Sequence, residues 1–327
     1  MQTGATPGST GASRAVDVLS IGETMALVVP ALAEPVDVAE EFRVETGGAE
    51  SNVACHLAAA GHRTAWLSAL GDDALGRRVR SRIERAGVDT SAVRLDPNAP
   101  TGLYVKDPGA GVSYYRRGSA ASRLRPEDLM RVAWDDVRVV HLSGITPALS
   151  QSCHALVDAA IDAARAHGVL VSFDVNHRPA LWPDTETAAT VIGAAARRAD
   201  IVWTGRDEAS DLWGVQTADD VRELFPDVPH LVVKDADVEA VEFSRGERSA
   251  APARRVAVVE PVGAGDAFAA GWLDGFLRGA DASERLQSGH TFAARALSST
   301  HDVPAEHPRT AATPDDDPGG TPRTSRK

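Results

Sequence analysis

Apolar residues occur along the chain in short runs rich in Val, Ile and Leu, which alternate with longer stretches rich in Ala, Arg and Glu. The short runs predict strands at Val16–Ile21, Thr64–Leu70, Arg138–Leu142, Val169–Asp174, Ile201–Trp203 and Leu231–Val233. The longer stretches predict helices at Asn52–Ala60, Leu75–Ala86 and Ser152–Ala166, each followed within two residues by a glycine, a common helix end. Such alternation predicts an α/β fold, in which helices cover both faces of a mostly parallel central sheet.

Two segments interrupt this alternation. Met25–Val44 and Thr101–Tyr115 carry strand-forming residues without an intervening helical pattern. We therefore predict a second, small β-sheet, formed from about residues 23–45 and 98–118, that covers the site as a lid.

Both ends of the chain lack the residues that build a core. Residues 304–327 contain five prolines and no Val, Ile, Leu, Met, Phe, Tyr or Trp, and residues 1–14 have a similar character. Such segments bury too little apolar surface to offset the entropy lost on ordering. We predict disordered tails at 1–14 and 304–327, and one folded domain over residues 15–303.

The composition argues against several classes of function. The 327 residues are 43% hydrophobic and 24% charged, as in ordinary globular proteins. A net charge of −12 argues against nucleic acid or an anionic membrane as a partner. With two cysteines, no secretory signal pattern and no apolar run of about 18 residues, we expect no disulfide framework and a cytoplasmic location. Whether copies of the chain form homo-oligomers stays open.

The strongest chemical signal is the segment Val262–Phe268, with the sequence VGAGDAF. Aromatic residues recur every four positions from its end, which predicts a helix directly after the glycines. Gly263 and Gly265 let the backbone turn its N–H groups toward one point, where the positive end of the helix dipole also lies. We therefore expect Gly263, Ala264 and Gly265 to form an anion hole for a phosphate group.

Asp266 stands in the first turn of that predicted helix. A carboxylate beside a bound anion costs energy unless it takes part in the chemistry, so a base that orients a hydroxyl group is an attractive role. The alternative is that Asp266 only caps a core helix after a glycine-rich turn.

Two segments resemble the PfkB, or ribokinase-like, family of carbohydrate kinases. Residues 260–271 resemble the family's C-terminal signature, and Thr46–Ala54 resembles its N-terminal Gly-Gly-x-x-x-Asn segment. In that family the N-terminal segment lines the sugar site, which implies substrate contacts from Gly47, Gly48 and Asn52. The resemblance covers essentially the whole folded part and implies a ribokinase-like three-layer α/β/α fold, with the acid at position 266 as the catalytic group.

Further segments resemble one branch of this family, the 2-keto-3-deoxygluconate kinases. They are Gly22–Met25, Ala99–Tyr104, Tyr114–Ser122, His141–Leu149 and Phe173–Trp182. Ribokinases usually carry an Asp shortly after the first strand, where it binds sugar hydroxyls. Ala26 and Leu27 stand near that place here, which argues against a neutral pentose as substrate.

Arginine and tyrosine residues in these segments suit a sugar acid. Tyr114 and Arg116 lie two positions apart on a predicted strand and so project to the same face. Arg178 follows a strand end, the usual place for ligands in an open α/β sheet. An Arg fork matches a carboxylate, although each arginine taken alone could be a solvated surface residue. In the resembled branch these positions, with Gly48 and Tyr104, contact the carboxylate and keto end of the substrate.

On the nucleotide side, the resemblance implies ATP and Mg²⁺ as cofactors. Glu208 stands where the family's Asn-x-x-Glu glutamate organises Mg²⁺ through water, although Gly205 replaces the Asn; taken alone, Glu208 is an acid at a helix N-terminus. Lys234, at a strand end, is expected to border the nucleotide. The family usually shows Lys-x-Gly-x-x-Gly there, and Ala236 and Glu239 replace the two glycines.

The sequence thus predicts an ATP-dependent kinase that phosphorylates the C6 hydroxyl of 2-keto-3-deoxygluconate, with Asp266 and the anion hole at its centre. A fructokinase or a keto-deoxygalactonate kinase is the alternative within the family. The altered 234–240 loop raises a third alternative, a non-catalytic protein that senses a sugar acid.

Overall fold

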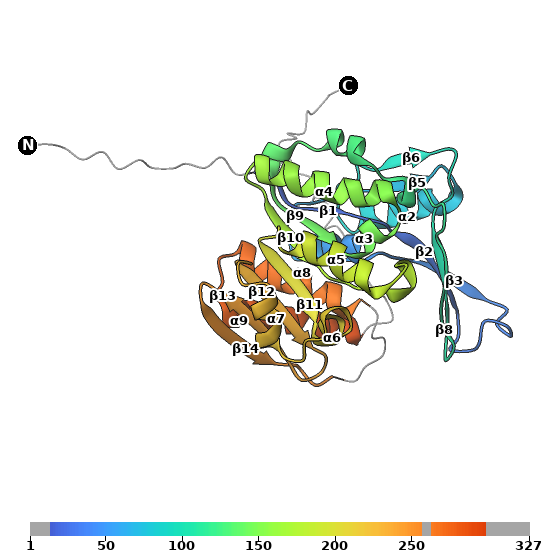
Figure 1. Ribbon diagram of the computed structural model, residues 1–327. Coiled ribbons are helices and arrows are strands. Elements are labelled where there is room, and N and C mark those ends of the chain that lie inside the picture. Colours follow the sequence, from blue (N-terminus) through green and yellow to red (C-terminus); the bar gives the residue numbers. More distant parts are fainter. Residues whose placement is uncertain (1–13, 257–262, 299–327) are drawn as a thin grey trace, which may run out of the picture.

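An eight-stranded sheet forms the centre of the computed structural model, which describes residues 14–256 and 263–298 (Figure 1). Its strand order is β14-β13-β12-β11-β10-β9-β1-β4, and the strands from β12 to β4 are parallel, as predicted. The strands are β1 (Val16–Ile21), β4 (Thr64–Leu67), β9 (Val137–Ser143), β10 (Leu170–Asp174), β11 (Ile201–Gly205), β12 (His230–Asp235), β13 (Glu239–Ser244) and β14 (Glu247–Pro252).

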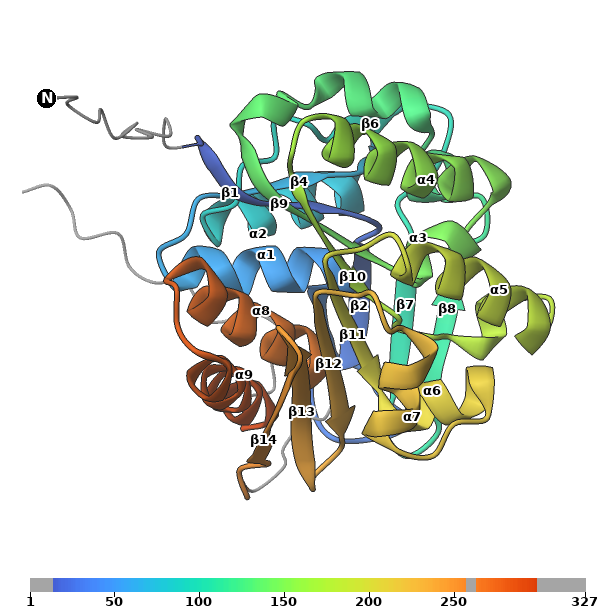
Figure 2. The ribbon, with the colours of Figure 1, turned by 60° about the vertical axis from the view of Figure 1, so that its left-hand side comes forward.

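Helices cover both faces of this sheet and complete the predicted three-layer α/β/α fold (Figure 2). One face carries α1 (Ala49–Ala59), α2 (Ala74–Arg85), α8 (Ala264–Leu277) and α9 (Ala282–Leu297). The other carries α4 (Gln151–Ala166), α5 (Thr185–Ala196), α6 (Arg206–Trp213) and α7 (Ala218–Leu224), with the short α3 (Ile145–Ala148) leading into α4. Neighbouring residues of a strand feed opposite layers: Val18 packs with α1 and α8, whereas Leu19 packs with α4.

The helix ends follow the expected capping chemistry. The predicted stop glycines Gly61, Gly87 and Gly168 all have positive φ, between 61° and 95°. Ser150 caps the N-terminus of α4, where its hydroxyl accepts a hydrogen bond from the backbone N–H of Cys153 at 3.1 Å.

The predicted small second sheet is present, with the order β3-β2-β7-β8. It consists of β2 (Met25–Pro30), β3 (Phe42–Gly47), β7 (Leu103–Asp107) and β8 (Gly111–Tyr115). Figure 1 shows it standing beside the main sheet, with β3 and β8 reaching away from the body. We call this sheet the lid.

Two details of the sheets differ from the prediction. The single strand expected over Thr64–Leu70 is divided, because Ser68 separates β4 from β5 (Ala69–Gly71), which pairs with β6 (Arg94–Asp96) in a small sheet of its own. The antiparallel hairpin of β13 and β14 was not predicted, since its charged residues do not form an apolar run.

Short 3₁₀ helices complete the described elements, at Ala121–Arg123, Pro126–Arg131, Trp134–Asp136 and Pro179–Leu181. No helix within residues 14–256 and 263–298 is long and apolar enough to span a membrane. The predicted tails lie outside the described residues apart from Arg14, which hydrogen-bonds the carbonyls of His167 and Gly168 at 3.1 Å. Glu260, Pro261 and Val262 of the C-terminal signature also lie outside them.

Candidate active site

A cavity of about 1290 Å³ opens between the lid, the carboxyl ends of β10 to β12 and the N-terminus of α8. This is the edge of a parallel sheet where ligands usually bind. Of the predicted site residues, all but Arg116 line the cavity: Gly47, Gly48, Asn52, Tyr104, Tyr114, Arg178, Glu208, Lys234, Gly263, Ala264, Gly265 and Asp266.

The N-terminus of α8 has the form that an anion hole requires. Gly263 is its N-cap residue, with a left-handed φ of 81°, a conformation that L side chains rarely adopt. The backbone N–H groups of the first turn have no partner within the helix and point out of its end. A Cβ atom on Gly265 would lie 3.6 Å from the Lys234 ammonium, so a cation lies directly beside this helix end.

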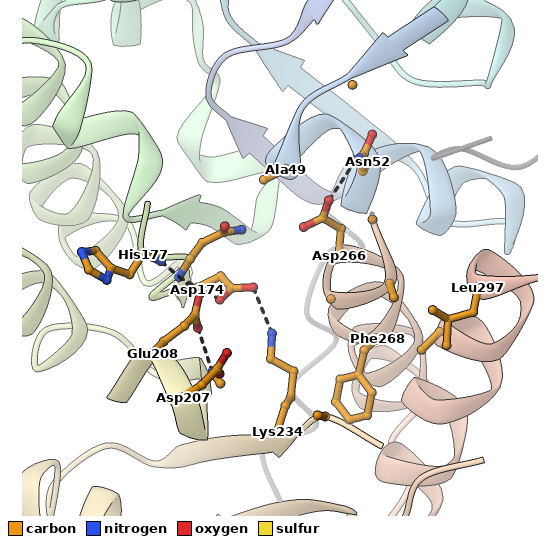
Figure 3. A pocket seen from close by; sticks show the side chains of 18 of the residues that line it. Ala49, Asn52, Asp174, His177, Asp207, Glu208, Lys234, Asp266, Phe268 and Leu297 are labelled. Atoms are coloured by element: carbon orange, nitrogen blue, oxygen red, sulfur yellow. Dashed lines mark hydrogen bonds and ion pairs between the residues drawn. The ribbon is translucent and has the colours of Figure 1, made fainter. Parts of the chain in front are cut away.

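Asp266 faces the cavity from the first turn of α8, and Asn52 from α1 donates a hydrogen bond to its Oδ2 at 2.8 Å (Figure 3). Burial raises the pKa of Asp266 to about 7, although the Asn52 hydrogen bond opposes the shift. Asp174 raises this pKa further, whereas the positive charges of Lys234 and Arg178 lower it. A carboxyl group with a pKa near 7 can both accept and return a proton near neutral pH.

Lys234, at the end of β12, extends into the cavity toward Asp174 at the end of β10 (Figure 3). Its Nζ lies 3.4 Å from Asp174 Oδ2. Burial alone would lower the pKa of Lys234, but the charges of Asp174, Glu208 and Asp266 outweigh burial and raise this pKa. The ammonium therefore stays charged in the middle of three carboxyl groups.

Glu208 lies in the first turn of α6, and both of its carboxyl oxygens bind backbone N–H groups. Oε2 accepts from Gly205 at 2.8 Å and Oε1 accepts from His177 at 3.0 Å. Burial and the nearby Asp174 raise the pKa of Glu208, while Lys234 opposes them. Within residues 14–256 and 263–298, no group of three or more His, Cys, Asp or Glu side chains is arranged to hold a metal ion by itself.

The lid end of the cavity is aromatic. The rings of Tyr104 and Tyr114, on paired strands, stack with centroids 5.7 Å apart. Gly48, where α1 begins, lies so close to the loop between β1 and β2 that a Cβ atom would come 2.4 Å from the Glu23 carbonyl oxygen. A glycine is therefore required at position 48 for reasons of space.

The two predicted arginines lie in different environments. Arg178 lines the cavity with its side chain half exposed, and its Nη1 is 3.8 Å from Glu208 Oε1. Arg116 does not line the cavity; its guanidinium lies over the Tyr114 ring, 5.7 Å from the ring centroid, and forms an ion pair with the buried Glu23. The prediction that Tyr114 and Arg116 lie on one strand is wrong in detail, because β8 ends at Tyr115 and Arg116 follows it. Of the two residues, only Tyr114 lines the cavity.

The loop after Lys234, where the family's glycines are replaced, retains a glycine-like conformation. Ala236 has a φ of 42°, which lies in the left-handed region. The carboxylate of Asp235 is bound by Arg206 at 2.9 Å, so this acid is neutralised. Asp237 and Glu239 line the cavity and add negative charge at its mouth.

Several polar cavity residues were not singled out from the sequence, among them Lys106, Asp174 and Asn176. Asp174 and Asn176 lie four and two residues before Arg178, and Lys106 lies two residues after Tyr104, on the same face of β7. Asn176 has a φ of 36° and is 5% exposed, and its Oδ1 has no hydrogen-bond partner among the described residues. Its position just after a strand end was the available sequence signal.

The helix end at Gly263, the facing carboxyl group of Asp266 and the Lys234 ammonium together suit the transfer of a phosphoryl group to a hydroxyl. Residues 16–306 match the model of the pfkB family of carbohydrate kinases. The chain belongs to this family and is a carbohydrate kinase.

The match to each of several named relatives covers most of the chain. A 2-dehydro-3-deoxygluconokinase of Bacillus subtilis (strain 168) is 33% identical over 296 residues, which are 88% of this chain and 91% of that protein. A 2-dehydro-3-deoxygluconokinase of Thermoproteus tenax is 33% identical over 83% of this chain and 85% of its own. Fructokinase-1 of Oryza sativa is 34% identical over 79% and 82%, respectively.

Solved structures agree with this assignment. The 2-dehydro-3-deoxygluconokinase of Thermotoga maritima superposes with a TM-score of 0.80 at 26% identity, covering 88% of this chain and 95% of its own. A fructokinase of Xylella fastidiosa with bound ATP gives a TM-score of 0.78 at 25% identity, covering 88% and 93%. The ribokinase-like fold predicted from the sequence is thereby confirmed.

Proposed function

We propose that this kinase transfers the γ-phosphoryl group of ATP to the C6 hydroxyl of 2-keto-3-deoxygluconate, also called 2-dehydro-3-deoxygluconate. The observation that carries the proposal is the position of Asp266, which faces the cavity beside the α8 N-terminus and Lys234. The two relatives that act on this sugar acid and the predicted carboxylate contacts support the choice of substrate.

The chain's own residues would act as follows. Asp266, held by Asn52, orients the C6 hydroxyl and accepts its proton as the new O–P bond forms. The backbone N–H groups of Gly263, Ala264 and Gly265 bind the oxygens of the phosphoryl group during transfer. Because the transition state of phosphoryl transfer is loose, positioning and charge neutralisation matter more than a strong base.

ATP and Mg²⁺ fit the nucleotide side of the cavity. A fructokinase relative binds ATP, and an apolar region lined by Phe268, Ala293 and Leu297 suits a purine base. Carboxylates outnumber cations among the lining residues, which suits a hydrated Mg²⁺ that arrives on the nucleotide. Glu208 would hold Mg²⁺ through water, because both its oxygens already bind backbone N–H groups. When bound, the ion neutralises charge on the phosphates.

An assay of ATP consumption across aldonates and ketohexoses tests the substrate. We expect 2-keto-3-deoxygluconate to give the highest kcat/KM. Arg178→Ala should raise KM for this acid on the order of tenfold or more, since a charge-assisted hydrogen bond is lost, and should leave KM for fructose nearly unchanged. Better turnover of fructose, or an equal effect on both substrates, would favour the fructokinase alternative, which Fructokinase-1 of Oryza sativa also supports.

The sensor alternative rests on the altered loop after Lys234. Its glycine-like turn at Ala236 and the Arg206–Asp235 pair argue that the loop still accommodates a nucleotide. Calorimetry distinguishes the two functions: binding of the sugar acid without any binding of ATP and Mg²⁺ would indicate a sensor, and binding of both supports the kinase.

A further inference from the structure

Glu23 is a buried acid that the proposed reaction leaves without a role. It lies in the loop between β1 and β2 and is 2% exposed. Its Oε1 accepts a hydrogen bond from the Ser119 hydroxyl at 2.6 Å. Its Oε2 accepts from Arg116 Nε at 2.7 Å and also from Arg116 Nη2. Both oxygens of this carboxylate are therefore committed to the segment that follows β8.

Close packing fixes the carboxylate in place. A Cβ atom on Gly102 would lie 2.8 Å from Glu23 Oε1, so the backbone before β7 closes one side. Arg116, whose side chain is 11% exposed, lies against the Tyr114 ring on the other side. With Nε and Nη2 bound to one oxygen, the guanidinium plane is set. Among the described residues no such contact is formed by Nη1, which can therefore reach a ligand.

We propose that Glu23 is a positioning residue that holds Arg116 beside the lid end of the cavity, where the sugar acid would bind, so that the guanidinium recognises the carboxylate of the substrate. This inference rests on the proposed function, because it requires a sugar acid as substrate. Arg116 acts on the substrate and Glu23 acts through Arg116.

In this arrangement Arg116 distinguishes ligands by the position of their carboxylate more than by their negative charge alone. A free arginine side chain loses much rotamer freedom when it binds, whereas Arg116 has lost that freedom before the substrate arrives. The ion pair with Glu23 also cancels most of the long-range field of Arg116, so anions in general are not attracted. A ligand gains from Arg116 only if its carboxylate lies within direct hydrogen-bond reach.

The first test is a graded pair of variants. Glu23→Ala should raise KM for 2-keto-3-deoxygluconate on the order of tenfold, because the Arg116 side chain would then lose its rotamer freedom only when the substrate binds. Glu23→Gln keeps a hydrogen-bond acceptor for Arg116 and should have a KM between wild type and Glu23→Ala. For both variants, kcat, KM for ATP and KM for fructose should stay within about twofold of wild type, because the phosphoryl end is untouched.

A double-mutant cycle tests the route of the effect. In an Arg116→Met background, Glu23→Ala should not raise KM further, because the residue that Glu23 positions is gone. Asp128→Asn is the matched control: Asp128 is also buried and paired with an arginine, Arg94, at 2.9 Å. Arg116 lies against the cavity residue Tyr114, whereas Arg94 hydrogen-bonds Asp96, Asp128 and Arg123, and none of these lines the cavity. This control should leave KM for the sugar acid unchanged. Thermal melting of every variant identifies those that are not folded.

Three results would overturn the inference: an unchanged KM in a folded Glu23→Ala variant, a decrease in KM, or the same rise with and without Arg116. Failure of the proposed function looks different, because the wild-type enzyme would then not phosphorylate the sugar acid at all.

Discussion

At the scale of single residues, the proposed mechanism assigns the proton transfer to Asp266, and the pKa of about 7 of this carboxyl group predicts that activity depends on pH. The carboxyl group must be ionised to accept the hydroxyl proton, so kcat/KM should fall about tenfold per pH unit below pH 7 and level off above it. Asp266→Asn should lower kcat by roughly 10²–10⁴ and remove this acid limb. A pH–rate profile of both enzymes checks the assignment.

The groups around Asp266 predict the direction of further shifts. Lys234 lowers the pKa of Asp266 and Asp174 raises it, while Asn52 and Arg178 are the other groups that face it. Lys234→Met should therefore move the acid limb to higher pH, and Asp174→Asn should move it to lower pH. Shifts of the same sign in both variants would contradict this electrostatic account.

Ala236 stores backbone strain beside the cavity, because its φ of 42° is a conformation that glycine favours. Ala236→Gly relieves the strain but increases the conformational entropy of the unfolded chain. Because relief of the strain is the larger effect, we expect a net gain of about 0.5–1 kcal/mol in the free energy of unfolding. Urea denaturation measures it. Arg245→Gly is the control, since Arg245 has a φ of 53° in the β13–β14 turn and does not line the cavity. It should give a similar gain, and a loss of stability in both would refute the strain.

At the scale of elements, Glu242 of β13 ties four elements together from a fully buried position. It accepts hydrogen bonds from Trp272 of α8 at 2.8 Å, from His230 of β12 at 3.2 Å and from the Arg285 guanidinium of α9. Burial alone would raise the pKa of Glu242, but these hydrogen bonds and the charge of Arg285 outweigh burial and lower it. The helix that carries the anion hole is fixed to the sheet through this group.

Removal of one partner from such a network leaves a buried charge without compensation. Glu242→Leu should lower the free energy of unfolding by about 3–5 kcal/mol near neutral pH. Because the folded-state pKa of Glu242 is lowered, the stabilisation is complete above its unfolded pKa and is lost as the pH falls through the folded value. The difference between variant and wild type should therefore shrink on acidification.

Denaturant unfolding at neutral and acidic pH measures this difference. Asp158→Ala is the control, because the half-exposed pair of Asp158 with Arg198 should contribute no more than about 1 kcal/mol. An equal loss from both variants would show that Glu242 has no special structural role.

The sequence predicted the elements that are encoded by residues close together along the chain. The parallel strands β9 to β12 are buried on both faces and so appear as apolar runs, and VGAGDAF contains its glycines, acid and helix start in one segment. The β13–β14 hairpin was missed because Glu242 is an acid that its partners on other elements neutralise. Glu23 was missed for the same reason, since Arg116 and Ser119 lie more than ninety residues away along the chain.

At the scale of the whole molecule, the cavity lies between the main sheet and a small lid that contributes aromatic residues. The lid residue Tyr114 is 51% exposed and stacks on Tyr104. Its ring therefore lines the lid end of the cavity without being part of the core. We expect a lid of this kind to exclude water from the phosphoryl group and so to limit wasteful hydrolysis of ATP. The neighbouring Tyr115 is 64% exposed and does not line the cavity.

These two tyrosines allow a matched test of the lid. Tyr114→Ser should raise KM for the sugar by about 2–10-fold, because the stacking energy of one aromatic pair is lost. It should also raise the ratio of ADP released to sugar phosphate formed above one, because water can then reach the nucleotide. Tyr115→Ser removes an equally exposed ring from the same strand but from its other face, and should leave the ratio at one. Parallel assays of ADP and of the phosphorylated sugar measure the ratio. A ratio of one in a Tyr114→Ser enzyme with a raised KM would mean that this ring binds the sugar but does not keep water from the nucleotide.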